Sequence, residues 1–127
     1  HSDLEQKTRE EVMNRFRNRD VNVLVATDIL SRGIDVENID MVINYDVPHD
    51  AEDYIHRIGR TARAEASGVA ITLINPKDQH RFAAIERLIG RSVHKGALPM
   101  AMGPGPEYKG KSEKKGRPGR TGKGRGR

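Results

Sequence analysis

Short apolar runs alternate with segments of helical composition, and this alternation constrains the fold more than any other feature of the sequence. The apolar runs cover residues 21–28, 41–46 and 68–74, and the helix-like segments cover 2–18, 50–60 and 75–90. The first run is almost wholly apolar and rich in β-branched residues, which is typical of a strand buried on both faces of a parallel sheet. We therefore predict an α/β fold, a parallel sheet flanked by helices, with further strands expected upstream of residue 1 because three strands make a small sheet.

The segment 75–90 carries the clearest helix signals. Asn75 is a suitable N-cap, Pro76 occupies the first helical position, and Gly90 follows as a stop. The spacing of the apolar residues predicts that Phe82, Ile85 and Ile89 face the core.

Charge divides the chain into two parts. Residues 1–106 carry 14 lysines and arginines against 16 acidic residues, whereas residues 107–127 carry 9 against 2. We expect residues 1–98 to form the folded part of a domain, and residues 99–127 to be a Pro/Gly linker with a disordered Gly/Lys/Arg-rich tail. Such a tail is typical of segments that follow nucleic-acid backbones, so we favour RNA tethering over a merely solubilising role.

Composition excludes some classes of protein and site. The chain has no cysteine, so disulfides and thiolate metal sites are excluded, and a reducing cytoplasm fits. No apolar run approaches the roughly 20 residues of a membrane-spanning helix, and no signal peptide is visible, so no membrane partner is expected. The first residue is His1 rather than methionine, and we expect the natural N-terminus to lie further upstream.

Two motifs lack the context that their chemistry needs. Residues 105–112 match the phosphate-loop pattern G-x-x-x-x-G-K-[ST], but prolines and glycines flank them instead of a strand and a helix. His49, Asp53 and His56 have helical spacing for a metal site, but no fourth ligand accompanies them. We interpret the first as a coincidence and the second as an acidic first helical turn beside a histidine with another role.

The polar residues that follow the strands are better candidates for a site. Open α/β sheets bind ligands at the carboxyl ends of their strands, where we expect Thr27, Asp28 and Asp46 to converge with the segment HRIGRTAR at 56–63. Arg60 and Arg63 are three residues apart and would share a helix face, where a bound polyphosphate would relieve their mutual repulsion. The alternative is that both arginines pair with acidic side chains on a solvated face.

Four motifs in order resemble the second RecA-like domain of a DEAD-box ATP-dependent RNA helicase. They are HSDLEQ with the arginine three residues after its glutamine, VLVATDILSRGIDV, VINYDVP and YIHRIGRTAR. The resemblance covers residues 1–98 and implies a partial RecA-like fold. The overall sequence, with its Gly/Lys/Arg tail, is most similar to the bacterial RhlE type. His56 favours the DEAD-box group over DEAH-type relatives, in which glutamine is usual, and over RecQ-type DNA helicases.

The resemblance implies roles at the nucleotide. Arg63 is similar to the arginine finger that reaches the γ-phosphate of ATP, and Arg60 resembles its partner on the same phosphate. His56 resembles the residue that links this motif to the first domain. Asp35 is similar to the carboxylate that accepts a bond from the ATP ribose, and Gly33 would let the backbone come close to the nucleotide.

The resemblance also implies contacts to RNA. Thr27 resembles a hydroxyl that contacts an RNA phosphate, and Gln6 and Arg9 match the family's Q-x-x-R on the RNA backbone. Contacts to the backbone hold a strand without reading its bases, so the expected binding is independent of sequence.

The remaining implications concern the intact protein. They are RNA and ATP as ligands, Mg²⁺ held mainly by a first RecA-like domain, factors of ribosome assembly or RNA degradation as candidate partners, and a cytoplasmic location. Because the phosphate loop of that first domain is not in this chain, we expect no ATP turnover by the chain alone. Two alternatives stay open: a non-enzymatic RNA-binding lobe or adaptor, and a related helicase that acts on DNA.

Overall fold

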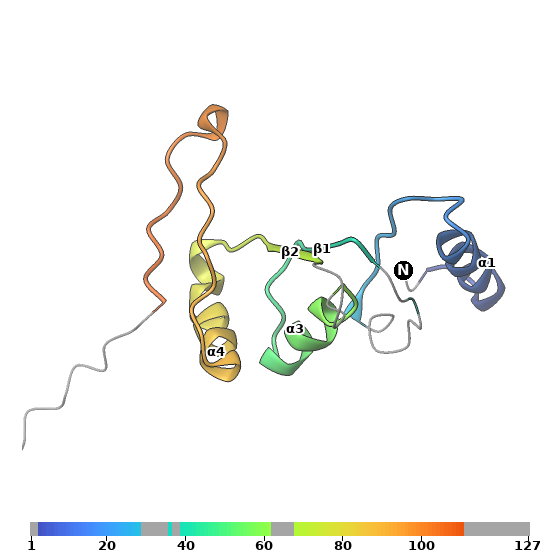
Figure 1. The fold of residues 1–127 in the computed structure, drawn as a ribbon, viewed down its shortest axis with the longest axis horizontal. Coiled ribbons are helices and arrows are strands. Elements are labelled where there is room, and N and C mark those ends of the chain that lie inside the picture. Colours follow the sequence, from blue (N-terminus) through green and yellow to red (C-terminus); the bar gives the residue numbers. More distant parts are fainter. Residues whose placement is uncertain (1–2, 29–35, 37–38, 62–67, 111–127) are drawn as a thin grey trace, which may run out of the picture.

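A short parallel strand pair connected through a helix forms the centre of the molecule. The structure, a computed structural model, describes residues 3–28, 36, 39–61 and 68–110 (Figure 1). β1 (Met41–Asn44) pairs in parallel with β2 (Val69–Thr72), with Met41 opposite Val69 and Asn44 opposite Thr72. The helix α3 (Ala51–Ile58) lies in the connection between the two strands, so the predicted α/β class is confirmed.

The strand expected at residues 21–28 is absent from the described structure. Residues 21–27 form no helix or strand there, and Val23 and Val25 are 77% and 86% exposed. The prediction of a buried strand was therefore wrong. An apolar run becomes a strand only when neighbouring strands satisfy its N–H and C=O groups, and among the described residues the sheet contains β1 and β2 alone.

Burial of the sheet on both faces was also expected, and the described residues contradict it. Side chains alternate between the two faces of a strand. Met41 and Ile43 of β1 are exposed, as are Val69 and Ile71 opposite them, whereas Asn44 on the other face is buried. The Asn44 side chain accepts a hydrogen bond from Arg57 of α3, so α3 lies on that face of the strand pair.

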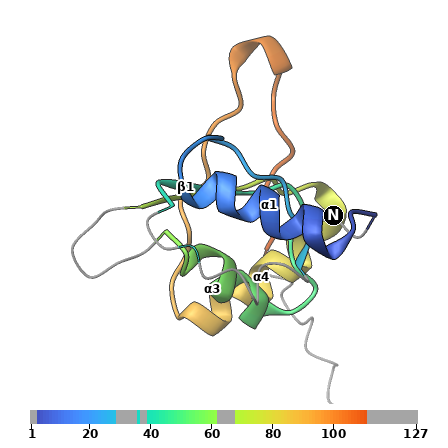
Figure 2. The ribbon, with the colours of Figure 1, turned by 90° about the vertical axis from the view of Figure 1, so that its right-hand side faces the viewer.

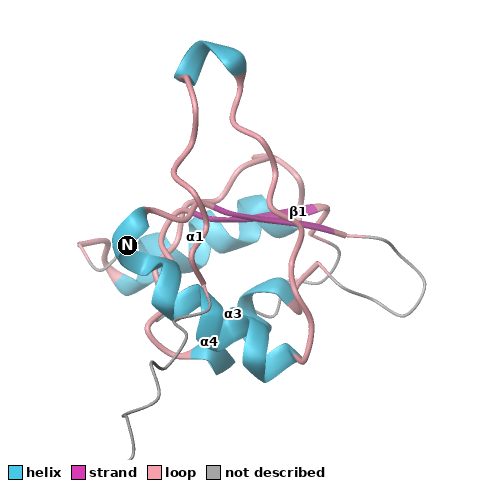
Figure 3. Cartoon of the chain, turned by 90° about the vertical axis from the view of Figure 1, so that its left-hand side faces the viewer, coloured by secondary structure: helices cyan, strands magenta, loops and turns pink. Residues whose placement is uncertain are grey.

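The hydrophobic core lies where α3 meets α4 (Gln79–Ile89), beneath the strand pair in Figure 3. Phe82 and Ile85 of α4 are almost completely buried. The ring of Tyr54 from α3 meets the ring of Phe82 edge to face, with centroids 5.9 Å apart. This packing confirms that Phe82 and Ile85 face the core, and it fixes the orientation of α3.

The predicted ends of the 75–90 helix are confirmed. The Asn75 side chain accepts hydrogen bonds from the backbone N–H groups of Lys77 and Asp78, and Pro76 opens a 3₁₀ turn, η1 (Pro76–Asp78), that leads into α4. Gly90 follows α4 with a φ of 70°, a left-handed conformation that glycine adopts without strain.

The first helix and the last segment lie at opposite ends of the molecule. α1 (Gln6–Arg17) lies beyond the strand pair from α4 (Figures 1 and 2). Residues 91–110, here called the C-terminal arm, leave α4, turn through a 3₁₀ helix, η2 (Met100–Met102), and return to α4 (Figure 1). No helix in the described part is both long and apolar enough to span a membrane.

Candidate functional site

The helix α3 and the turn that follows it carry the first part of the HRIGRTAR segment. Glu52 and Asp53 lie in the first turn of α3, where negative charge is favourable, and His56 lies in the last turn. The helix ends at Ile58. The backbone N–H of Arg60 then donates to the carbonyl three residues earlier at 3.3 Å, so Arg60 lies in a tight turn and not on the helix as predicted.

The reason for this early end is a set of contacts that turn the chain toward the start of β1. Thr61 is buried, and its hydroxyl donates to the carbonyl of Asp40 at 3.2 Å. Gly68, which precedes β2, lies so close to Thr61 that an added Cβ would collide with the threonine hydroxyl and carbonyl. The turn at Arg60 and Thr61 is therefore fastened to the amino-terminal end of the strand pair.

A second contact fastens α3 at the other end of β1. The Nε of Arg57 donates to the Oδ1 of Asp28 at 2.7 Å, and one terminal nitrogen also contacts that oxygen. The other terminal nitrogen donates to the Oδ1 of Asn44 at 3.3 Å and to the carbonyl of Asp46 at 3.1 Å. The predicted meeting of Asp28, Asp46 and the HRIGRTAR segment is thus confirmed, but the residue that joins them is Arg57.

Sequence reasoning missed Arg57 as a member of the site. Its position inside the motif was a signal, since it lies between His56 and Arg60. Nothing in the sequence, however, pairs Arg57 with Asp28, which is 29 residues away.

His56 is exposed on α3. Its Nδ1 lies 3.9 Å from the Oδ1 of Asp53, one turn earlier, and its side chain is 57% exposed. An exposed imidazole is accessible to a partner domain or ligand. The described residues contain no group of three His, Cys, Asp or Glu side chains that could hold a metal ion, so they offer no site of that kind at His49, Asp53 and His56.

The residues expected to contact RNA lie in two places. Gln6 and Arg9 lie in the first turn of α1, where the Gln6 amide donates to Glu10 at 3.1 Å. Gln6 is exposed and Arg9 is half-buried. Thr27 is also exposed and directly precedes Asp28, the partner of Arg57. The structure thus brings Thr27 close to α3, whereas α1 lies at the end of the molecule (Figure 1).

Three predicted site residues fall outside the described residues. They are Gly33, Asp35 and Arg63. Their roles at the nucleotide stay predictions.

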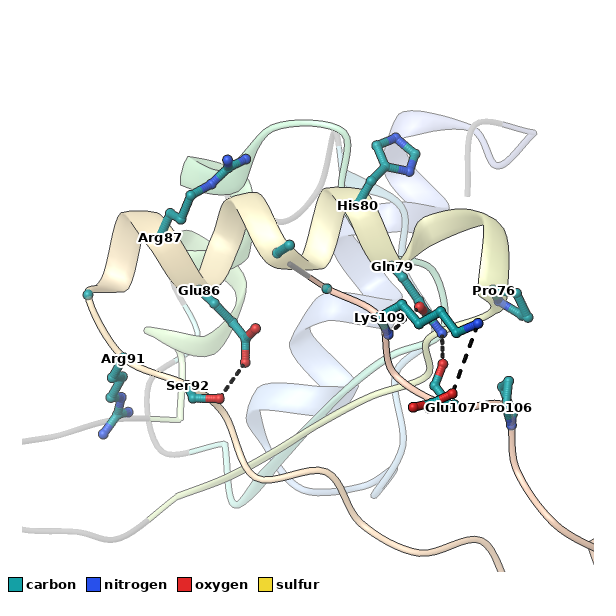
Figure 4. Close-up of a pocket in the computed structure, with 13 residues that line it drawn as sticks. Pro76, Gln79, His80, Glu86, Arg87, Arg91, Ser92, Pro106, Glu107 and Lys109 are labelled. Carbon is teal, nitrogen blue, oxygen red and sulfur yellow. Dashed lines mark hydrogen bonds and ion pairs between the residues drawn. The ribbon is translucent and has the colours of Figure 1, made fainter. Parts of the chain in front are cut away.

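A groove lies between α4 and the returning C-terminal arm (Figure 4). The Gln79 side chain holds the arm there: it donates to the carbonyl of Glu107 at 2.9 Å and accepts from the backbone N–H of Lys109 at 2.8 Å. The ring of Tyr108 packs edge to face on Phe82, with centroids 6.2 Å apart. The arm is thereby docked on the outer side of the core.

Glu86 is the polar centre of this docking. Its carboxylate accepts from the backbone N–H of Val93 at 2.7 Å and from the Tyr108 hydroxyl at 2.9 Å, and it also contacts the Lys95 ammonium. Burial raises the pKa of Glu86, but the hydrogen bonds from Lys95, Val93 and Tyr108 outweigh burial and hold that pKa below its ordinary value. Burial and the neighbouring Glu86 carboxylate raise the pKa of Tyr108 to about 12.

Fold and site together define an α/β lobe whose charged helix is fastened across a parallel strand pair. The family model of the helicase conserved C-terminal domain matches residues 1–65, which is about half of the chain. The chain therefore belongs to the helicase C-terminal domain family, and its relatives are DEAD-box proteins.

Curated relatives share almost half of the aligned residues with this chain. The ATP-dependent RNA helicase DBP8 of Yarrowia lipolytica is 46% identical over 95 residues, which cover 75% of this chain and 22% of the relative. The ATP-dependent RNA helicase DeaD of Mycobacterium tuberculosis is 45% identical over 97 residues, which cover 76% of this chain and 17% of the relative. The chain thus spans about one fifth of the length of these relatives.

Solved structures agree with the fold. The DEAD-box protein SrmB of E. coli, in complex with the regulator of ribonuclease activity A, matches with a TM-score of 0.72 and 37% identity, covering 84% of this chain and 62% of that chain. A DEAD-box protein of Methanococcus jannaschii matches with a TM-score of 0.65 and 44% identity, covering 71% of this chain and 25% of that chain. These matches support the predicted RecA-like lobe.

The raised pKa of Tyr108 gives a test of the docked arm. A phenol whose pKa is raised on folding stabilises the docked state below the ordinary pKa of about 10, and this contribution is lost as the pH rises through about 12. We expect ultraviolet titration, with a Tyr108→Phe variant subtracted, to place the midpoint of Tyr108 near 12.

Substitution of the neighbouring carboxylates tests whether Glu86 contributes to the raised pKa of Tyr108. Glu86→Gln should lower the Tyr108 midpoint toward the ordinary value, because the adjacent negative charge is removed and the hydroxyl can then donate only to a neutral acceptor. Glu107→Gln is the matched control, since Glu107 lies on the same arm with an exposed side chain, and it should leave the midpoint unchanged. A Tyr108 midpoint near 10 in the unaltered protein would contradict docking of the arm.

Proposed function

We propose that this chain is the C-terminal RecA-like part of an ATP-dependent DEAD-box RNA helicase, which couples ATP binding and hydrolysis to the unwinding or remodelling of RNA. The single observation that carries the proposal is the double fastening of α3. Arg57 holds the helix at the carboxyl end of β1, and Thr61 holds the following turn at the start of β1. The segment with His56 and Arg60 is thus presented on a fixed support, as a charge clamp for phosphate requires.

Arg60 and Arg63 are the proposed phosphate contacts. Negative charge develops on the γ-phosphoryl oxygens during transfer, and an arginine placed in advance stabilises it without reorganisation. The guanidinium group is planar and binds two phosphate oxygens at once, which an ammonium group cannot do in the same way. In this proposal Arg63 acts as the arginine finger and Arg60 holds the same phosphate, while His56 contacts the first domain.

The donor groups present here fit a nucleotide phosphate better than a metal ion. The described part of the segment offers guanidinium and imidazole groups, and two carboxylates near it already face cations or the imidazole: Asp28 is bound to Arg57, and Asp53 lies 3.9 Å from His56. We therefore assign Mg²⁺ to the first domain, where it would neutralise charge on the β- and γ-phosphates. Asp35 and Gly33 are the proposed contacts of this chain to the ribose and the nucleotide backbone.

Gln6, Arg9 and Thr27 are the proposed contacts to RNA. Amide, guanidinium and hydroxyl groups all donate hydrogen bonds to phosphate oxygens, and none of these contacts depends on the base. When RNA and ATP each bridge the two domains, the cleft between the domains closes and Arg63 reaches the nucleotide. Release of the γ-phosphate removes the anion that both arginines hold, and the cleft reopens.

The type of helicase, its location and its partners are proposed from the motifs and the composition of the sequence. We propose that the intact protein belongs to the bacterial RhlE type, acts in the cytoplasm, and works with factors of ribosome assembly or RNA degradation. The Gly/Lys/Arg tail supports the RhlE type, and the absence of cysteine supports the cytoplasm. A non-enzymatic RNA-binding lobe is the alternative, and a phosphate-loop domain upstream in the complete gene would argue against it; a requirement for the 2′-hydroxyl would argue against a DNA helicase.

The basic tail is a second proposed RNA contact. Residues 111–127 carry eight lysines and arginines against one acid, with no apolar residue among them. The docked arm supports this role, because Gln79 and Glu86 fix the chain just before the tail begins. A tail attached at a fixed point can hold an RNA near the lobe without reading its sequence.

The arginine finger is tested by Arg63→Ala in the protein encoded by the complete gene. We expect RNA-stimulated ATP hydrolysis to fall by about 10³- to 10⁵-fold, because the transition-state charge loses its partner. RNA affinity, measured by fluorescence anisotropy, should change little. Arg87→Ala, an exposed arginine on α4, is the control and should leave both quantities unchanged.

Two results would count against the finger role. The first is an equal loss of hydrolysis and RNA binding in the Arg63→Ala protein, which would indicate a general defect. The second is hydrolysis of ATP by the present chain alone, which would mean that the first domain is not required.

The tail is tested by removal of residues 111–127. RNA affinity should fall, and the slope of log K against log salt concentration should shrink by roughly 0.7 for each lost phosphate contact. A tail of equal length with its eight cations replaced by glutamine separates charge from length and should behave as the truncated protein does. An unchanged salt slope in both variants would reject the tether.

A further inference from the structure

The guanidinium group of Arg57 joins three separate parts of the chain. Two of its nitrogens bind the Asp28 carboxylate, and the third binds the Asn44 side chain and the Asp46 carbonyl. Asn44, the last residue of β1, in turn donates from Nδ2 to the Thr72 hydroxyl at 3.1 Å. The network therefore runs from the segment before Asp28, through α3, to the last residues of both strands.

Burial makes this network sensitive to any break. The Arg57 side chain is 17% exposed, and Asn44 is 2% exposed. A buried polar group that loses its partner bears its full desolvation cost, so a partly broken network of this kind is unfavourable. Asp28 differs, because its side chain is 47% exposed and can move together with Thr27, the residue before it.

We propose that Arg57 is a positioning residue that couples the RNA-contacting segment at Thr27 to His56 on α3 and to the phosphate-contacting Arg60 in the turn after that helix. The inference rests on the proposed helicase function and adds a residue and a route to it. Thr27 is joined covalently to Asp28, and Asp28 is held by Arg57, which lies next to His56. A shift of Thr27 on RNA binding therefore reaches α3 directly.

The geometry explains why the shift would move the helix and not the sheet. Asn44 and Thr72 lie in paired strands, so their ends of the network are fixed. The Tyr54 ring holds the middle of α3 on Phe82, whereas Arg57 lies in the last turn of the helix, so a displacement of Asp28 acts on the carboxyl end of α3. Displacement of Asp28 thus changes the angle at which His56 and Arg60 are presented.

Arginine is required at this position by the number and arrangement of the bonds. Its planar fork donates in two directions at once, toward Asp28 and toward the end of β1. A lysine keeps the charge but offers a single nitrogen, so it cannot hold both partners in the same geometry. Arg57→Lys therefore separates the coupling from the charge.

The experiment measures ATP hydrolysis by the protein encoded by the complete gene, with and without RNA. For Arg57→Lys we expect the stimulation of kcat by RNA to fall by about 5- to 150-fold, the range of typical coupling between sites. The KM for ATP without RNA and the affinity for RNA without nucleotide should stay within about twofold of the unaltered protein. Arg87→Lys, on the exposed side of α4, is the matched control and should keep full stimulation.

Asp28→Asn provides the second variant. It removes the charge from the exposed end of the network, so the buried end stays paired and the protein is expected to fold even where Arg57→Lys does not. Stimulation by RNA should fall in Asp28→Asn as well. In the double variant it should fall no further than in the more affected single variant, since both act on one connection.

The outcomes separate this inference from the proposed function. An unaltered protein that is not stimulated by RNA would contradict the helicase function itself. If the unaltered protein is stimulated and Asp28→Asn retains that stimulation, Arg57 does not couple the two sites. A uniform loss of ATP binding, RNA binding and thermal stability in both variants would likewise overturn the coupling, because it would mean that Arg57 only supports the fold.

Discussion

The parallel pairing of β1 with β2 is the constraint on which the site depends. Parallel neighbours cannot be joined by a tight hairpin, so the chain between Asn44 and Val69 must cross from one end of the pair to the other. The crossover is built on α3, and the HRIGRTAR segment begins within it. Arg57 and Thr61 then fasten the crossover near opposite ends of β1. The position of the charged residues is thus a consequence of strand direction.

Packing of α4 against α3 makes this support rigid and links it to the C-terminal arm. Phe82 lies between the rings of Tyr54 and Tyr108, so one buried side chain contacts both the site helix and the arm. Glu86, one turn later on α4, holds the arm through Val93 and Tyr108. The same helix therefore positions the proposed phosphate contacts on one side and the start of the basic tail on the other.

The sequence was sufficient for the elements whose signals are local. The strands near 41–46 and 68–74, the helix in 50–60, and the cap and stop at Asn75 and Gly90 all depend on residues close to one another in the chain. The resemblance predicted the family correctly, because its motifs are long and follow one another in a fixed order. The fold class and the meeting of Asp28 with the arginine segment were predicted on these grounds.

What the sequence could not provide depends on partners distant in the chain. Whether the apolar run at 21–28 pairs as a strand is decided by its neighbours and not by its own composition. The bond from Arg57 to Asp28 joins residues 29 positions apart, and the bond from Tyr108 to Glu86 joins residues 22 positions apart, with no local signal for either.

The most direct measurement is a crystal structure of the protein encoded by the complete gene, bound to RNA and a non-hydrolysable ATP analogue. The account predicts that Arg60 and Arg63 contact the γ-phosphate while Arg57 remains on Asp28; a γ-phosphate contacted only by the first domain, with both arginines paired to carboxylates of their own lobe, would contradict it.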